Sequence, residues 1–156
     1  MKKISEHISY KEATFSDTAK RLKITNKPKD EHIENMELLA EKVFEPLREW
    51  VGHPIKVNSF YRSEKLNQRI GGALSSAHVS GQAIDITTLG GKTNLEMFFY
   101  IKDNLDFDQI ISEYPDASGE PKWIHVSYNN KKDNRKQALE IRRKGKYYTY
   151  TGCKTC

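Results

Sequence analysis

The chain has 156 residues, of which 37% are hydrophobic and 30% charged, a size and balance typical of one soluble domain with a single hydrophobic core. Its mean hydropathy is −0.77, and no apolar run approaches the roughly 20 residues of a membrane-spanning helix, so we expect no membrane span. The net charge of +5 and the pI of about 9.1 favour an anionic partner, although a solvated basic surface would give the same numbers.

The N-terminal residues MKKISEHISYKEAT carry no apolar stretch behind their lysines, so we expect no secretory signal peptide. The first 25 residues indicate two short helices, the second capped by Ser16. After a break at Asn26-Lys-Pro, a long amphipathic helix is predicted from about Asp30. Pro46 should kink or restart this helix, and Gly52 should end it. Its buried stripe is Ile33, Met36, Leu39, Ala40, Val43, Leu47 and Trp50.

Strands and helices then alternate along the rest of the chain. Strands are predicted at 55–60, 82–87, 107–113 and 123–128, helices at 63–70 and 93–105, and a hairpin of 138–143 with 146–151 around Lys144-Gly145. Helices early and mainly antiparallel strands late predict a single α+β domain over residues 1–156, with helices packed on one face of a mostly antiparallel sheet.

The C-terminal third holds most of the excess positive charge, in Lys131, Lys132, Arg135, Lys136, Arg142, Arg143, Lys144 and Lys146. Together with Tyr147, Tyr148 and Tyr150, these residues allow a nucleic-acid-binding interpretation. We favour the alternative that the tyrosines pack as part of a hairpin, and we expect no nucleic acid. Cys153 and Cys156 have no second Cys or His pair to complete a zinc site, and residues 152–156 are predicted to be a frayed tail.

Two of the predicted strands carry metal-ligand side chains. Asp85 lies between Ile84 and Ile86, where strand alternation sends it to the opposite face and where a carboxylate is costly unless it is paired or metal-bound. His78 lies seven residues earlier, and a turn at Ser80-Gly81 can fold it back toward Asp85. In the segment WIHVS, alternation likewise turns His125 away from the core.

A His-Asp-His set gives zinc three protein ligands and leaves a fourth position for water, as in a catalytic site. Zinc lowers the pKa of its water and polarises a substrate carbonyl, but a proton acceptor is still required. Alternation in FDQIISE places Phe107, Gln109, Ile111 and Glu113 on one face. Glu113 can therefore reach the cleft beside WIHVS, as the general base.

The ordered set SYKEAT, SDTAKRL, SFYRSEKLNQRIGG, SAHVSGQAIDI, FDQIISE and WIHVSY resembles the M15 family of zinc D-Ala-D-Ala carboxypeptidases and phage endolysins, and more distantly the zinc domain of Hedgehog proteins. The resemblance implies one zinc ion held by His78, Asp85 and His125. It also implies that Ser76 contacts substrate and that Arg62 holds a developing oxyanion or a substrate carboxylate.

In one respect the chain departs from the family pattern. Many relatives place the catalytic acid three residues before the last histidine, where this chain has Lys122. The likeness of FDQIISE to the Hedgehog zinc domain assigns the role to Glu113, with Glu120 as the alternative. Gln109 and Trp123 complete the expected substrate-binding residues.

The resemblance therefore implies a zinc peptidase that hydrolyses peptidoglycan stem peptides, as a carboxypeptidase or an endolysin endopeptidase. The alternative is a zinc-binding module of the same fold without turnover. We expect a monomer that stays in the cytoplasm, or is released from there as an endolysin.

Overall fold

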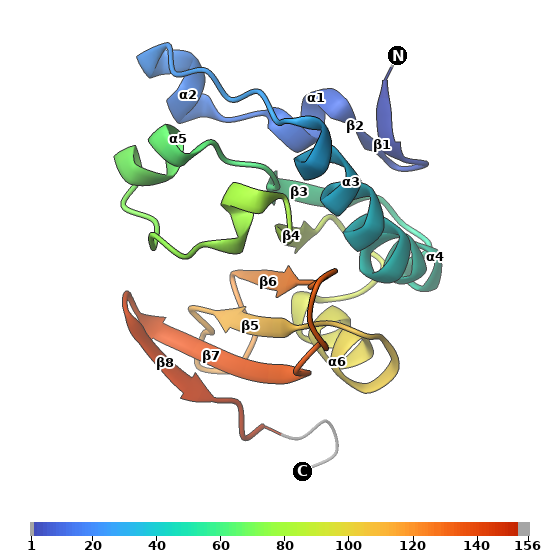
Figure 1. The fold of residues 1–156 in the computed structure, drawn as a ribbon. Helices are drawn as coiled ribbons and strands as arrows, with labels where there is room; N and C mark the ends of the chain where they lie inside the picture. The colour runs from blue at the N-terminus through green and yellow to red at the C-terminus, as the bar shows by residue number, and fades with distance from the viewer. Residues whose placement is uncertain (1, 153–156) are drawn as a thin grey trace.

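A computed structural model describes residues 2–152 and shows the predicted α+β architecture (Figure 1). A six-stranded sheet has the order β3-β4-β6-β5-β7-β8, and a small two-stranded sheet pairs β1 with β2. All neighbouring strands are antiparallel except β5 and β7, which run parallel. The prediction of a mostly antiparallel sheet is confirmed.

The N-terminal segment contains β1 (Lys3–Ser5), β2 (Ile8–Ser9), α1 (Tyr10–Thr14) and α2 (Asp17–Leu22). The two short helices were predicted, and the Ser16 side chain caps α2 by accepting a hydrogen bond from the backbone N–H of Ala19. The β1-β2 pair was not predicted, because strands of two or three residues are too short to show alternation.

The long helix is continuous but changes its winding in the middle. It comprises α3 (Asp30–Leu39), the π-helical turn η1 (Ala40–Phe44) and α4 (Glu45–Val51). Pro46 has no N–H to donate to the carbonyl of Lys42, and just before it the N–H of Glu45 bonds to Ala40 in the wider register. The predicted restart at Pro46 is thus a π-bulge, and Gly52 ends the helix with φ +66° as expected.

The large sheet is built from β3 (Ile55–Ser59), β4 (Ala83–Thr88), β5 (Gln109–Glu113), β6 (Trp123–Ser127), β7 (Gln137–Arg143) and β8 (Lys146–Thr149). The helices α5 (Glu64–Arg69) and α6 (Asn94–Asn104) and the 3₁₀ turn η2 (Ala77–Ser80) lie between strands in the sequence. All six strands lie within one or two residues of their predicted bounds. The turn η2 was predicted only as a chain reversal.

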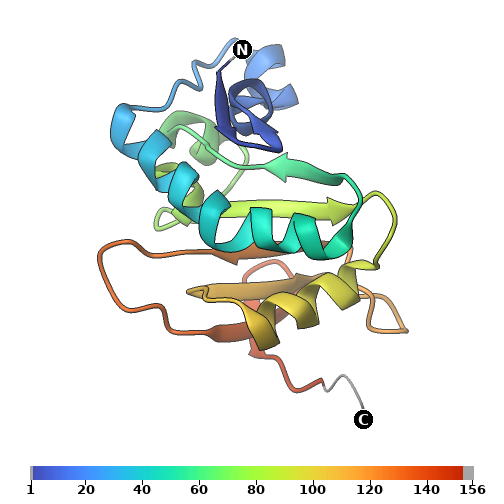
Figure 2. The same ribbon diagram turned by 90° about the vertical axis from the view of Figure 1, so that its right-hand side faces the viewer.

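The long helix and α6 cover one face of the large sheet (Figure 2). Ile84, Ile86, Ile110, Ile124 and Val126 point into this core, with side chains that are fully buried. The opposite face of the central strands, next to α5 and η2, carries the candidate site described below.

One prediction at the start of β5 was wrong. Phe107 precedes β5 and belongs to the main core with Ile110, so its prediction on the same face as Glu113 was wrong. Alternation does not extend past the strand end.

None of the helices in residues 2–152 has both the length and the apolar character to cross a bilayer. Cys153 and Cys156 lie outside the described residues.

Candidate metal centre and active site

The strands β4 and β6 bring two candidate ligands side by side. Asp85 pairs directly with His125 in the antiparallel register, and both side chains point away from the core that holds Ile84 and Ile124. Adjacent side chains on one face of paired strands lie about 5 Å apart at Cβ, close enough to share a bound ion. The carboxylate Oδ1 of Asp85 lies 2.9 Å from Nδ1 of His125.

His78 reaches the same point from the turn η2. Ser76 caps this turn by accepting a hydrogen bond from the backbone N–H of His78, and Gly81 ends it with φ +74°. A Cβ at position 81 would lie 2.6 Å from the backbone oxygen of His32, so glycine is required there by both conformation and space. The chain reversal expected at Ser80-Gly81 is the feature that folds His78 back over β4.

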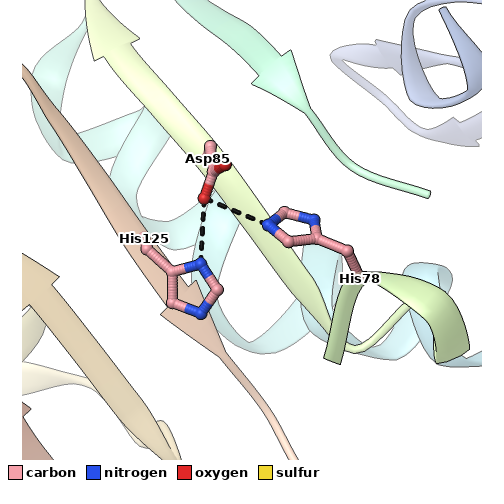
Figure 3. A group of neighbouring side chains, drawn as sticks. All are labelled: His78, Asp85 and His125. Carbon is pink, nitrogen blue, oxygen red and sulfur yellow. Dashed lines mark hydrogen bonds and ion pairs between the residues drawn. The ribbon is translucent and has the colours of Figure 1, made fainter. Parts of the chain in front are cut away.

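The ring of His78 is held in one orientation. Its Nδ1 lies 2.7 Å from the carbonyl oxygen of Phe60 and donates to it, because a carbonyl can only accept. The side chain is 1% exposed, and its Nε2 is buried with no hydrogen-bond partner among the described residues. That nitrogen lies 3.2 Å from Oδ1 of Asp85 (Figure 3). A backbone acceptor on one ring nitrogen, leaving the other as a lone-pair donor, is the usual arrangement of a metal-ligating histidine.

The three side chains converge on one point. One ligand atom from each of His78, Asp85 and His125 lies within 4.8 Å of the others. Burial lowers the pKa of His78, although Asp85 opposes this, and a lowered pKa favours the neutral ring that metal binding needs. Burial would raise the pKa of Asp85, but the charges of the two imidazoles and the hydrogen bond from His125 hold it well below its usual range.

Two imidazoles and a carboxylate are a donor set that suits zinc. Because no group among residues 2–152 makes a hydrogen bond to Nε2 of His78, the residues present fit a metal ion. A second group of possible ligands, Glu6, His7 and Glu45, is mostly exposed, and His7 and Glu45 already pair at 2.6 Å.

Glu113 lies on the next strand, on the same face. It pairs with Trp123 on β6, two residues from His125. Burial raises the pKa of Glu113 to about 7, with Asp85 adding to the shift and His125 opposing it. Within residues 2–152 its carboxylate accepts no hydrogen bond. A carboxylate whose pKa lies near 7, and whose oxygens accept no hydrogen bond from the described residues, suits a general base.

Arg62 borders the cluster from the segment between β3 and α5. Its backbone N–H donates to the carbonyl of His78, and its Nη2 donates to Oγ of Ser76 at 3.3 Å. Its Nε is buried and has no partner in the described part of the chain. Burial lowers the pKa of the guanidinium, while Asp85 partly restores it. The guanidinium of Arg62 is thus a fixed cation whose Nε–H is available to a ligand.

Comparison with protein families decides the identity of this arrangement. Residues 6–127 match the family described as Peptidase M15, and this span includes every predicted site residue. The chain belongs to the peptidase M15 family. Among curated proteins no sequence matches it. The family assignment supports a peptidase and implies a peptide substrate, and M15 peptidases are in general zinc-dependent.

The other predicted site residues of this M15 peptidase lie in two places. Gln109 and Trp123 share the face of Glu113, and the Gln109 side chain donates to Oε1 of Gln137 at 2.6 Å. Glu120 lies apart, because its carboxylate accepts the N–H of Leu95 at the start of α6 at 2.6 Å. Glu120 therefore interacts with the N-terminus of α6, and Glu113 is the acidic residue beside the candidate metal ligands.

Sequence reasoning missed two features of the M15 site. The carbonyl of Phe60, which orients His78, belongs to the backbone and leaves no signature in the sequence. Tyr114 follows Glu113 with φ +51°, a strained conformation for an aromatic residue, and its ring packs on Trp123 at 5.3 Å. This strain marks the end of β5 next to Glu113.

Proposed function

We propose that the protein is a zinc-dependent peptidase that hydrolyses peptide bonds in bacterial peptidoglycan stem peptides. The observation that carries the proposal is the buried, unpartnered Nε2 of His78 beside Asp85 and His125, in a chain of the M15 family. Two strands and one turn hold these three groups together. Contacts within the described part of the chain leave Nε2 of His78 without a hydrogen bond.

His78, Asp85 and His125 would hold the ion. Zinc bound there would lower the pKa of a water molecule and polarise the scissile carbonyl. The protein supplies the proton transfers through Glu113, whose pKa near 7 allows it to accept a proton from the attacking water and return it to the leaving amine. The partial burial of its carboxylate keeps it basic enough for the first of these transfers.

Arg62 supplies fixed positive charge next to Asp85, on the side held by Ser76. Its buried Nε and its guanidinium plane match a carboxylate or an oxyanion of the substrate. Ser76 keeps the guanidinium in place and offers its own hydroxyl to the substrate. The position of these two residues at the edge of the cluster supports this proposed binding role.

The test compares Glu113→Gln with Glu120→Gln in the full-length, zinc-loaded chain. Purified peptidoglycan is incubated with each protein, products are identified by mass spectrometry, and bound zinc is measured. We expect Glu113→Gln to keep its zinc and to lose at least about 10²-fold in rate, because only the proton acceptor is removed. Glu120→Gln should stay within a few-fold of the wild-type rate.

Two results would contradict this proposal. Full turnover by Glu113→Gln together with loss in Glu120→Gln would move the base to Glu120. A wild-type protein that binds zinc and releases no peptide product would instead be a zinc-binding module without turnover.

A further inference from the structure

The C-terminal hairpin β7–β8 lies outside residues 6–127, the span that matches the family, yet it extends the face that carries the site. Glu113 on β5 pairs with Ile141 on β7, and Ile141 pairs with Tyr147 on β8. Paired residues share a face, so Glu113 and Tyr147 stand on the same side of the sheet with Ile141 between them. Two strand spacings, about 10 Å, separate their backbones.

The residues of this row form a continuous surface beside the site. Ile141 is only 3% exposed although it lies on the face opposite the helices, so its neighbours cover it. Burial raises the pKa of the Tyr147 phenol, and the charges of Glu113 and Asp85 raise it further. The phenol is therefore within range of the charges of both carboxylates. A tyrosine and a glutamate that flank one isoleucine can both reach a molecule bound above it.

The hairpin also reaches the other side of the site. The ammonium of Lys144, at the hairpin turn, lies so close to Gly71 that a Cβ there would sit 2.8 Å from it. Gly71 follows α5, in the segment that leads to Ser76 and His78. In Figure 1 the hairpin tip and this segment lie at the same edge of the molecule. Sheet, hairpin and the 71–76 segment thus surround the site face.

Tyr147 and Tyr148 make a natural comparison. They are neighbours on β8 and equally exposed, at 54% and 52%, and within residues 2–152 neither phenol makes a hydrogen bond. Tyr148 pairs with Glu140 and faces the other way, toward the side where Tyr150 packs on Phe98 at 4.6 Å. One residue of the pair faces Glu113, and its neighbour does not.

We propose that Tyr147 is a further substrate-binding residue, whose phenol donates a hydrogen bond to a main-chain oxygen of the bound peptide on the Glu113 side of the site. The hairpin is then the outer wall of the peptide cleft. Among residues 2–152 the phenol has no hydrogen-bond partner to give up. It is exposed enough to meet a ligand, and it stands where a peptide extending from His125 past Glu113 would cross β7. This inference rests on the proposed peptidase function.

The test uses Tyr147→Phe and, as its matched control, Tyr148→Phe in the full-length, zinc-loaded protein. The probe is a synthetic stem pentapeptide that contains both an L-Ala–D-Glu and a D-Ala–D-Ala bond. Steady-state kinetics are measured for each variant, and calorimetry gives the dissociation constant of the peptide in a Glu113→Gln background. We expect Tyr147→Phe to raise KM and the dissociation constant about tenfold, the effect of one lost hydrogen bond to the ligand. Tyr148→Phe should change neither, and both variants should melt at the wild-type temperature.

The outcomes separate the two proposals. Cleavage by the wild type with equal constants for both variants overturns the role of Tyr147 and leaves the peptidase function standing. Binding that depends on Tyr147 without any cleavage overturns the peptidase function and retains Tyr147 as a binding residue. Equal losses in the two variants, with a lower melting temperature, would assign a structural role to the hairpin tyrosines and overturn the inference. A wild type that neither binds nor cleaves the peptide contradicts both.

Discussion

His78 contributes to the site through both of its ring nitrogens. Nδ1 donates its N–H to the Phe60 carbonyl, so the lone pair of the ring is on Nε2, which faces Asp85. Strand alternation in the sequence was enough to predict that Asp85 and His125 leave the core, because both lie between isoleucine or valine neighbours. It could not predict the partner of His78, since a backbone carbonyl 18 residues away has no side-chain pattern.

The burial of Glu113 has a consequence for stability in the metal-free protein. Its pKa is raised from an ordinary 4.5 to about 7 in the folded state. Below pH 4.5 the carboxyl is protonated in both states. Between 4.5 and 7 the unfolded chain releases the proton and the folded chain keeps it, so rising pH favours unfolding.

We therefore expect the free energy of unfolding of the metal-free wild type to fall relative to that of Glu113→Gln as pH rises from about 4.5 to about 7, and to level off above. Urea unfolding of both proteins at a series of pH values in EDTA measures this difference. A difference that stays constant over the range would mean that Glu113 ionises normally and is solvated.

At the scale of elements, one buried asparagine fastens the ends of the two ligand-bearing strands. Oδ1 of Asn94, in the first turn of α6, accepts the N–H of Thr88 at the end of β4. Its Nδ2 donates to the carbonyls of Pro121 and Lys122 just before β6. Thr93 and Glu96 form a capping box that holds this turn in place. Asn94 thus helps to set the register that pairs Asp85 with His125.

Asn94→Ala should lower the free energy of unfolding by about 2–4 kcal/mol, because it leaves buried backbone groups of both strands without partners. Asn104→Ala, at the exposed end of the same helix, removes one hydrogen bond to Tyr100 and should cost no more than about 0.5 kcal/mol. Chemical denaturation of the two variants checks the contrast. Equal effects would show that the Asn94 bonds do not hold the strands.

Element positions were largely predictable from the sequence, because hydrophobic periodicity and capping residues such as Ser16 are local signals. Besides the short β1–β2 pair, three features were not predictable. The π-turn at Ala40–Phe44 follows from how the chain accommodates Pro46 within a packed helix. The 3₁₀ turn of His78 depends on contacts of Gly81 with a distant helix. The parallel pairing of β5 with β7 is a long-range choice of partner.

In the whole molecule, the two faces of the large sheet have different roles. One face buries the core against the long helix and α6, and the other carries the ligands, Glu113 and Tyr147 of the C-terminal hairpin. The sequence predicted this division through the opposite orientations of Ile84 and Asp85. Strand alternation alone could not show which face of the hairpin Tyr147 occupies, or that Tyr150 on the other face packs on Phe98 of α6.

A metal ion that binds the folded chain and not the unfolded one stabilises the fold, so the metal centre should influence the entire molecule. The most direct test of the account is the zinc content of the full-length protein after EDTA treatment, reloading and removal of excess metal. The account predicts about one zinc per chain in the wild type, with little or none in His78→Ala and a lower melting temperature when the wild type is stripped. A wild type that retains no zinc, or a His78→Ala variant that binds as much, would contradict it.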